Sequence, residues 1–239
     1  MMHTPFILGI LQCDSVLEQF QPQFGNYPSM LSELFIQAAP AIEIKVYDVQ
    51  HDHYPSHLDE CNGYVTTGSK ASVYDDEIWI KQLEDFILAL HQARKKLIGI
   101  CFGHQLIAQA LGGKVSAAQQ GWGVGVHTNK IHQHPNWLHP VQETFNLVVS
   151  HKDQVTQLPI GAKLIAYNDF CPHAAFQIDS HILTVQGHPE FSKPYAETLM
   201  KYRRKVLGEK CYSEGIESLA KPTDHILFTQ WMVNFMKME

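Results

Sequence analysis

Short apolar runs alternate with amphipathic stretches through the first half of the chain, and few folds accommodate this alternation. The predicted strands are residues 6–11, 42–49, 63–67 and 97–100. The predicted helices are residues 29–39, 75–96 and 102–111, with acids in the first turn and bases in the last turn of the second one. The alternation predicts a parallel sheet with helices on both faces, whose chemistry lies at the carboxyl ends of the strands.

The pattern changes after Gly112 and Gly113 to shorter β-like runs. These runs are residues 125–127, 147–149, 164–166 and 182–185, and helices are predicted at 195–207 and 227–238. We expect this half to extend the sheet with antiparallel or mixed strands. The whole pattern predicts an α/β three-layer sandwich, with a mostly parallel central sheet, helices on both faces and an antiparallel extension.

Composition limits the class of protein. With 239 residues, 45% of them hydrophobic, and no repeat or linker, we expect residues 1–239 to form a single domain. The net charge of −6, without a basic run longer than three residues, argues against nucleic acid as a partner. Residues 6–11 lack a basic leader and are too short for a membrane span or a signal core, so we expect a cytoplasmic protein without membrane association.

Cysteine and histidine patterns do not indicate a metal or a disulfide framework. The five cysteines are an odd number and form no CxxC pair. The histidines at 51, 53 and 57, and at 127, 132, 134 and 139, lack the usual ligand spacing. We expect them in solvated loops, with metal binding as the less favoured alternative, and we expect no cofactor.

Cys101 stands in the sequence Gly99-Ile100-Cys101-Phe102-Gly103, between a predicted strand and a predicted helix. This G-x-C-x-G pattern is typical of a nucleophile elbow, in which the flanking residues crowd one another and favour glycine. The N-terminus of the following helix would also stabilise a thiolate. The alternative is a buried cysteine with chance glycines.

His188 and Glu190 are the candidate partners of this thiol. Because Pro189 favours an extended backbone at His188, the two side chains are expected to project to the same side. Glu190 could then orient one imidazole nitrogen while the other faces Cys101. The alternative is an H-x-E pair on the surface.

Four segments together resemble the class I (triad) glutamine amidotransferases. They are residues 63–69, 99–105, 150–159 and 186–190, and they occur in the family's order. The resemblance implies a flavodoxin-like form of the α/β sandwich. It also implies a Cys101-His188-Glu190 triad that releases ammonia from glutamine through a γ-glutamyl thioester.

The resemblance also implies roles in substrate binding. Backbone N–H groups of Phe102 and of the Gly68-Ser69 turn would stabilise the oxyanion. Gln105, together with the backbone around Ser150, His151 and Lys152, would hold the amide and the amino-acid end of glutamine.

The oxyanion loop departs from the family's usual Gly-Gly-Pro, because here it reads Gly68-Ser69-Lys70. Since serine takes positive φ less freely than glycine, we expect the loop to need a partner or a different substrate to settle. A Gly-Ser version resembles the stand-alone branch related to the amidotransferase domain of guanosine monophosphate synthetase, which includes γ-glutamyl peptidases acting on glutathione-like compounds.

Three functions therefore remain open. The first is hydrolysis of glutamine, and the second is cleavage of another γ-glutamyl compound. The third is a glutaminase subunit that is inactive alone and passes ammonia to a separate synthase chain. The last alternative arises because the amidotransferase-like domain is expected to fill all 239 residues.

Overall fold

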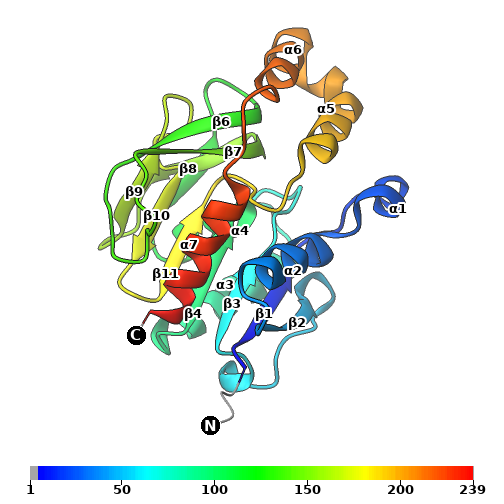
Figure 1. The fold of residues 1–239 in the computed structure, drawn as a ribbon. Helices are drawn as coiled ribbons and strands as arrows, with labels where there is room; N and C mark the ends of the chain where they lie inside the picture. Colours follow the sequence, from blue (N-terminus) through cyan, green and yellow to red (C-terminus); the bar gives the residue numbers. More distant parts are fainter. Residues whose placement is uncertain (1–4, 239) are drawn as a thin grey trace.

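The computed structural model describes residues 5–238, and its centre is a nine-stranded sheet in the order β2-β1-β3-β4-β11-β10-β9-β6-β7 (Figure 1). The strands are β1 (Ile7–Gln12), β2 (Glu43–Asp48), β3 (Gly63–Thr66), β4 (Lys96–Ile100), β5 (Lys114–Ala117), β6 (Gly123–Ile131), β7 (Thr144–His151), β8 (Asp153–Gln157), β9 (Lys163–Tyr167), β10 (Ala175–Ile178) and β11 (Ile182–Val185). The α-helices are α1 (Gln21–Phe24), α2 (Tyr27–Ala38), α3 (Ile78–Gln92), α4 (Phe102–Ala110), α5 (Lys193–Leu207), α6 (Glu209–Ser218) and α7 (His225–Lys237).

The sheet is parallel on one side and antiparallel on the other. Strands β2, β1, β3, β4 and β11 pair in parallel. From β11 onward, β10, β9, β6 and β7 pair antiparallel. This arrangement confirms the predicted parallel core with an antiparallel extension. Strand β11 joins the two parts, although it is the last strand in the sequence.

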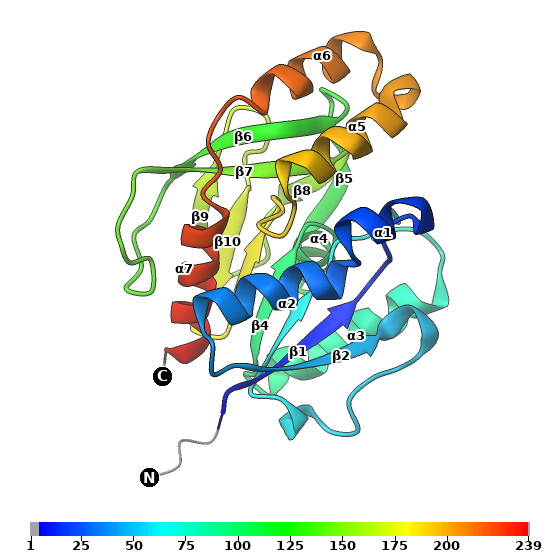
Figure 2. The ribbon, with the colours of Figure 1, turned by 45° about the vertical axis from the view of Figure 1, so that its right-hand side comes forward.

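Helices cover both faces of the parallel part, as the sequence predicts. Helices α2 and α7 lie on one face and α3 and α4 on the other (Figures 1 and 2). Successive strand side chains alternate between the two cores. Val65 and Ile98 pack with α2 and α7, whereas Tyr64 and Leu97 pack with α3 and α4.

The predicted helix at 75–96 is shorter in the structure. Helix α3 begins at Ile78, so the acids expected in its first turn precede it. Arg94 takes a left-handed conformation, with φ of 53°, and Lys96 already belongs to β4. Lys96 Nζ donates to the carbonyls of Ser180 and Phe235, at 2.8 and 3.1 Å. These tertiary contacts favour the extended backbone over another helical turn.

Several elements lie outside the sequence prediction. Strands β5 and β8 form a separate two-stranded sheet, and β10 is a hairpin partner of β11. Helix α6 follows α5 directly after Gly208, and Gly215 is its one fully buried residue. Figure 2 shows α5 and α6 above the β6–β7 edge of the molecule.

Candidate active site

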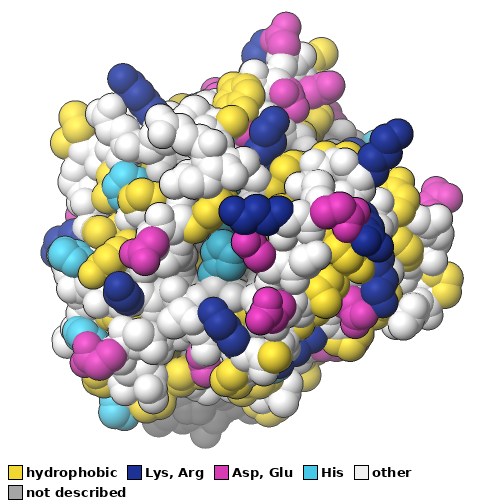
Figure 3. Space-filling view, turned by 90° about the horizontal axis from the view of Figure 1, so that it is seen from above, with side chains coloured by type: hydrophobic (Ala, Val, Ile, Leu, Met, Phe, Trp, Pro, Cys, Tyr) yellow, Lys and Arg dark blue, Asp and Glu magenta, His cyan; other side chains and the backbone are white. Residues whose placement is uncertain are grey.

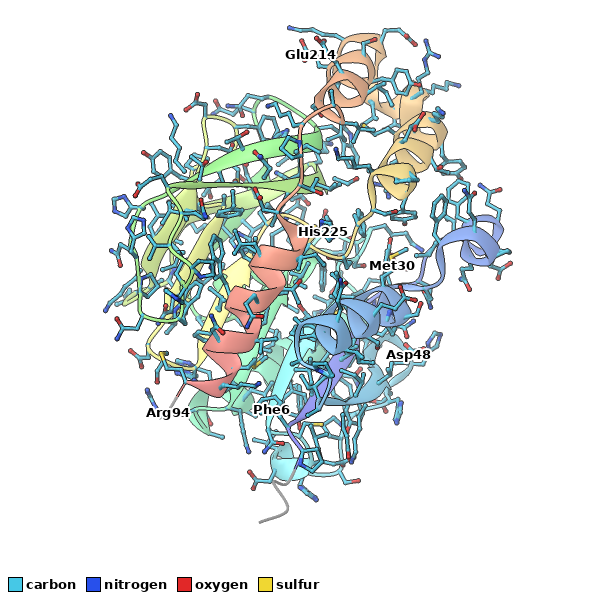
Figure 4. All side chains as sticks on the ribbon, in the orientation of Figure 1. Phe6, Met30, Asp48, Arg94, Glu214 and His225 are labelled. Atoms are coloured by element: carbon cyan, nitrogen blue, oxygen red, sulfur yellow. The ribbon has the colours of Figure 1, made fainter. Side chains whose placement is uncertain are left out.

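The candidate site lies where the parallel strands end. Phe6, before β1, and Arg94, before β4, lie at the end of the molecule away from Glu214 of α6 (Figure 4). The parallel strands therefore run toward the α5–α6 end. Seen from that end, histidine, basic and acidic side chains gather near the centre of the face (Figure 3).

Cys101 occupies a strained turn between β4 and α4. Its φ and ψ are 50° and −99°, and its N–H donates to the Val185 carbonyl at 2.9 Å. A Cβ at Gly99 would lie 2.8 Å from the Gly103 oxygen, and one at Gly103 would lie 1.7 Å from Thr66 Oγ1. Neither position has room for a side chain, so both must be glycine. This is the crowding around the nucleophile that the elbow pattern predicts.

His188 and Glu190 lie together, as expected for residues two apart in extended chain. His188 Nδ1 is 2.7 Å from Glu190 Oε1, and the two residues are 4% and 6% exposed. The backbone N–H of His188 donates to the Val148 carbonyl at 2.8 Å, and this bond connects the segment to β7. The Phe191 ring stacks on the imidazole with 3.8 Å between centroids. The imidazole is therefore fixed at its edge by Glu190 and across its face by Phe191.

Electrostatics favour a protonated His188. Burial alone would lower its pKa, but the charges of Glu190 and Cys101, with hydrogen bonds to both, raise the pKa from 6.5 to about 10. A cation beside the sulfur stabilises a thiolate, which is the nucleophilic form of cysteine.

The turn expected to supply oxyanion donors lies against this pair. A Cβ at Gly68 would come within 2.8 Å of His188 Cε1, so the histidine leaves room there only for glycine. Neither Gly68 nor Ser69 has positive φ. The expected conflict at Ser69 therefore does not arise, because this backbone does not use the left-handed region.

Asp14 holds the loop in place. Its carboxylate accepts the Lys70 backbone N–H at 2.9 Å and lies 3.4 Å from Lys70 Nζ. Asp14 is 5% exposed and follows the end of β1. The loop that was expected to need an external partner thus has an internal one.

Gln105 and Gln186 form a chain of hydrogen bonds that ends at the nucleophile. Gln105 Nε2 donates to the Asp153 carbonyl at 2.7 Å and to Gln186 Oε1 at 3.1 Å. Gln186 Nε2 in turn lies 3.6 Å from Cys101 Sγ. Gln105 lines the same cavity as Cys101, and the hydrogen bonds of its Nε2 fix the position of its side chain.

Ser150, His151 and Lys152 also line this cavity, whose volume is about 400 Å³. Ser150 Oγ accepts from Arg203 Nη1 at 3.0 Å, and Lys152 is exposed. His151 is 4% exposed, and neither of its ring nitrogens has a hydrogen-bond partner within residues 5–238. Burial, followed by the charges of neighbouring histidines, holds the pKa of His151 well below its usual value, so the ring is neutral.

The structure thus brings all ten predicted site residues to one region: Gly68, Ser69, Cys101, Phe102, Gln105, Ser150, His151, Lys152, His188 and Glu190. Sequence reasoning assigned no role to Asp14, Gln186 or Arg203. The position of Asp14 after a buried strand was a usable signal, because chemistry gathers at such ends. Arg203 carried no signal, since it lies in a helix whose exposed face is generally basic.

Residues 5–238 contain neither a metal-binding cluster nor a membrane-spanning helix. No three His, Cys, Asp or Glu side chains there are grouped as a metal site would require. No helix in that range combines the length and apolar character needed to cross a bilayer.

Comparison with known proteins gives consistent matches. The sequence model described as "Glutamine amidotransferase class-I" matches residues 27–203. The chain is 30% identical to Gamma-glutamyl peptidase 3 of Arabidopsis thaliana, over 97% of this chain and 96% of that protein. It is 33% identical to a glutamine-hydrolysing GMP synthase of Thermomicrobium roseum, over 70% of this chain and 30% of that protein. Its fold is similar to that of a glutamine amidotransferase from Thermotoga maritima, with a TM-score of 0.79, 16% identity and coverage of 99% and 100% of the two chains.

Proposed function

The chain belongs to the class I glutamine amidotransferase family, and we propose that it hydrolyses the γ-amide bond of glutamine or of another γ-glutamyl compound, with Cys101 as nucleophile. One observation carries the proposal. Cys101, with φ of 50° at the start of α4, lies beside a buried His188 whose Nδ1 is 2.7 Å from Glu190. A thiol, a base and a group that orients the base are the parts that thiolate catalysis needs.

In the proposed reaction, the Cys101 thiolate adds to the γ-carbonyl carbon. The C–N bond then breaks, and His188 gives its proton to the leaving ammonia or amine. Water then adds to the γ-glutamyl thioester while His188 takes a proton from the water, and the C–S bond breaks, which releases glutamate and restores the Cys101 thiolate and protonated His188. The raised pKa of His188 supports this sequence, because the proton is held until the leaving nitrogen can accept it.

We assign stabilisation of the oxyanion to the backbone N–H of Phe102 and to the Gly68-Ser69 turn. Phe102 is the first residue of α4, so its N–H has no acceptor one turn earlier in the helix. The hydrogen bond that the Lys70 backbone N–H donates to Asp14 supports an oxyanion loop whose conformation is set before substrate binds. Removal of one such donor costs about 3 kcal/mol where it has been measured.

We assign the amino-acid end of the substrate to Gln105 and to the segment of Ser150, His151 and Lys152. All four residues line the cavity that contains Cys101. The unpartnered nitrogens of His151 support a polar ligand here, because buried polar groups usually have hydrogen-bond partners.

A γ-glutamyl peptidase is the second candidate. It is favoured by the match to Gamma-glutamyl peptidase 3, which extends over 97% of this chain. In that case the leaving group is an amino acid or a peptide, and the released amine is not passed on as ammonia.

The test is a substrate comparison with one purified preparation, in which glutamine and glutathione are assayed for free glutamate. Cys101→Ala should abolish release from every substrate that the wild type cleaves. Full activity of Cys101→Ala would disprove the proposed nucleophile. Strong preference for glutathione would replace the glutaminase with the peptidase.

The third candidate is a glutaminase subunit that passes ammonia to a separate synthase chain. It is favoured by the match to one part of a GMP synthase. If the purified chain is inert and gains Cys101-dependent glutaminase activity when a co-purifying protein is added, this candidate is correct. Full activity of the isolated chain would argue against it.

A further inference from the structure

We propose that Arg203 forms a subsite for a carboxylate on the leaving group. The preferred substrates are then γ-glutamyl amino acids or peptides with a free carboxylate, and glutamine is a poorer substrate. This inference rests on the proposed hydrolysis at Cys101 and concerns the other side of the scissile bond.

Arg203 reaches the cavity of Cys101 from α5. One nitrogen, Nη1, donates to Ser150 Oγ at 3.0 Å, and the guanidinium carbon lies 5.5 Å from the centre of the Trp122 ring. Both contacts fix the guanidinium plane, while most of its five N–H donors remain for a ligand. A fixed guanidinium of this kind matches the geometry of a carboxylate.

The charges around the cavity are not balanced. Within residues 5–238, no carboxylate lies within 4.0 Å of the side-chain nitrogens of Arg203 or Lys152, although both residues line the cavity. Arg204, the next residue, is instead paired with Glu209 at 2.6 Å. The cavity thus presents two cations that a substrate can neutralise. Lys152 is assigned above to the amino-acid end of the substrate, so Arg203 is left for a second carboxylate.

Among residues 5–238, Asp153 is the one Asp or Glu that lines the cavity. Asp153 accepts hydrogen bonds from the hydroxyls of Ser72 and Tyr74, in the segment after β3, and its backbone carbonyl accepts from Gln105. An α-ammonium group of the γ-glutamyl part suits this carboxylate. Arg203 belongs to α5, where Leu199 and Val206 add apolar lining.

These charges indicate which substrates the cavity prefers. Glutamine has one carboxylate, and its leaving group is ammonia, which needs no subsite. A γ-glutamyl amino acid has a second carboxylate beyond the scissile bond. A cavity of about 400 Å³ is also within the range that encloses ligands larger than one amino acid.

The test uses two substrates that differ in one charge, γ-glutamylglycine and γ-glutamylglycinamide. For the wild type, we expect kcat/KM to be about tenfold higher with γ-glutamylglycine, as one charged hydrogen bond would give. In Arg203→Met the ratio of the two values should fall close to one, and Arg203→Lys should retain part of the preference. Arg204→Met is the matched control and should keep the wild-type ratio, because Arg204 does not line the cavity.

Each other outcome has a distinct meaning. Equal kcat/KM for the two substrates in the wild type overturns the subsite. An equal loss for both substrates in Arg203→Met also overturns it, because Arg203 would then support Ser150 or bind the α-carboxylate that both substrates share. If neither substrate nor glutamine is cleaved, the proposed hydrolysis itself fails, and the subsite fails with it.

Discussion

Asp14 is a buried carboxylate that lies outside the thiol, imidazole and carboxylate of the proposed triad. It accepts backbone N–H groups of Ser15 and Lys70, at 2.8 and 2.9 Å. Its charge is balanced in part by Lys70 Nζ at 3.4 Å. Because Lys70 follows Ser69 directly, these contacts fix the conformation of the turn that we propose as the source of N–H groups for the oxyanion.

Asp14→Asn should therefore impair acyl transfer more than reactivity of the thiol. Asparagine keeps the size but loses the charge and one acceptor oxygen. We expect kcat for γ-glutamyl hydrolysis to fall at least about tenfold, with little change in KM. Alkylation of Cys101 by iodoacetamide, which develops no oxyanion, should keep its rate.

Asp179→Asn is the control for this variant, since Asp179 is exposed and pairs with Arg94 on the surface. The control should keep both rates. A parallel loss of hydrolysis and alkylation in Asp14→Asn would mean that the variant disorders the whole site, and it would refute the specific role of Asp14.

His188 gives a prediction about pH. Its raised pKa means that the protonated ring persists through neutral pH, and activity should decline as pH rises through the pKa near 10. The negative charge of Glu190 is one cause of the raised pKa. In Glu190→Gln, we expect lower kcat/KM and an alkaline limb that moves to lower pH. The measurement is a pH profile of kcat/KM, and an unmoved limb would contradict the proposed pair.

At the scale of elements, α5 and α6 depend on a close contact with β6. A Cβ at Gly125 of β6 would lie 2.6 Å from the Gly215 carbonyl oxygen, and one at Gly215 would lie 2.7 Å from Val124 Cγ2. Ser218 Oγ adds a hydrogen bond from the Val126 N–H at 2.8 Å. Helix α6 therefore packs on the strand through its smallest residue and supports α5, which supplies Arg203.

Gly215→Val should separate α6 from β6. Overpacking at such a contact costs about 1–3 kcal/mol, which for a chain of this size lowers Tm by roughly 2–12 °C. The preference for γ-glutamylglycine should fall together with Tm, because α5 loses its support.

Ser213→Val is the matched control for this variant, since it places the same β-branched side chain at an exposed position of α6. We expect its Tm and its substrate preference to stay close to those of the wild type. Equal effects of the two variants would mean that helix propensity, and not the contact with β6, determines the result.

At the scale of the whole molecule, local patterns predicted the parallel core well. Strands β1, β3 and β4 are short, buried and apolar, so their sequences alone identify them. The C-terminal end of α3 is followed by Lys96, which contacts residues far along the chain. The position of β11 between β4 and β10 also depends on tertiary pairing, which periodicity does not encode.

The candidate site shows the same division. Cys101, His188 and Glu190 lie in short motifs whose local geometry carries information, and the structure brings them together. Asp14, which follows β1, contacts Ser69 across 55 residues of sequence, and Arg203 of α5 contacts Ser150 across 53 residues. Such contacts become visible only when the sheet is assembled.

The place of β11 in the sheet has a consequence for biosynthesis. During translation, β4 and Cys101 emerge from the ribosome before β11, His188 and Glu190. Strand β11 then completes the middle of the sheet. A nascent chain that has emerged only as far as α4 has the sulfur without its proposed base. If the proposed triad is correct, the order of translation delays hydrolysis until the C-terminal part of the chain has emerged, and we expect shorter nascent chains to be inactive.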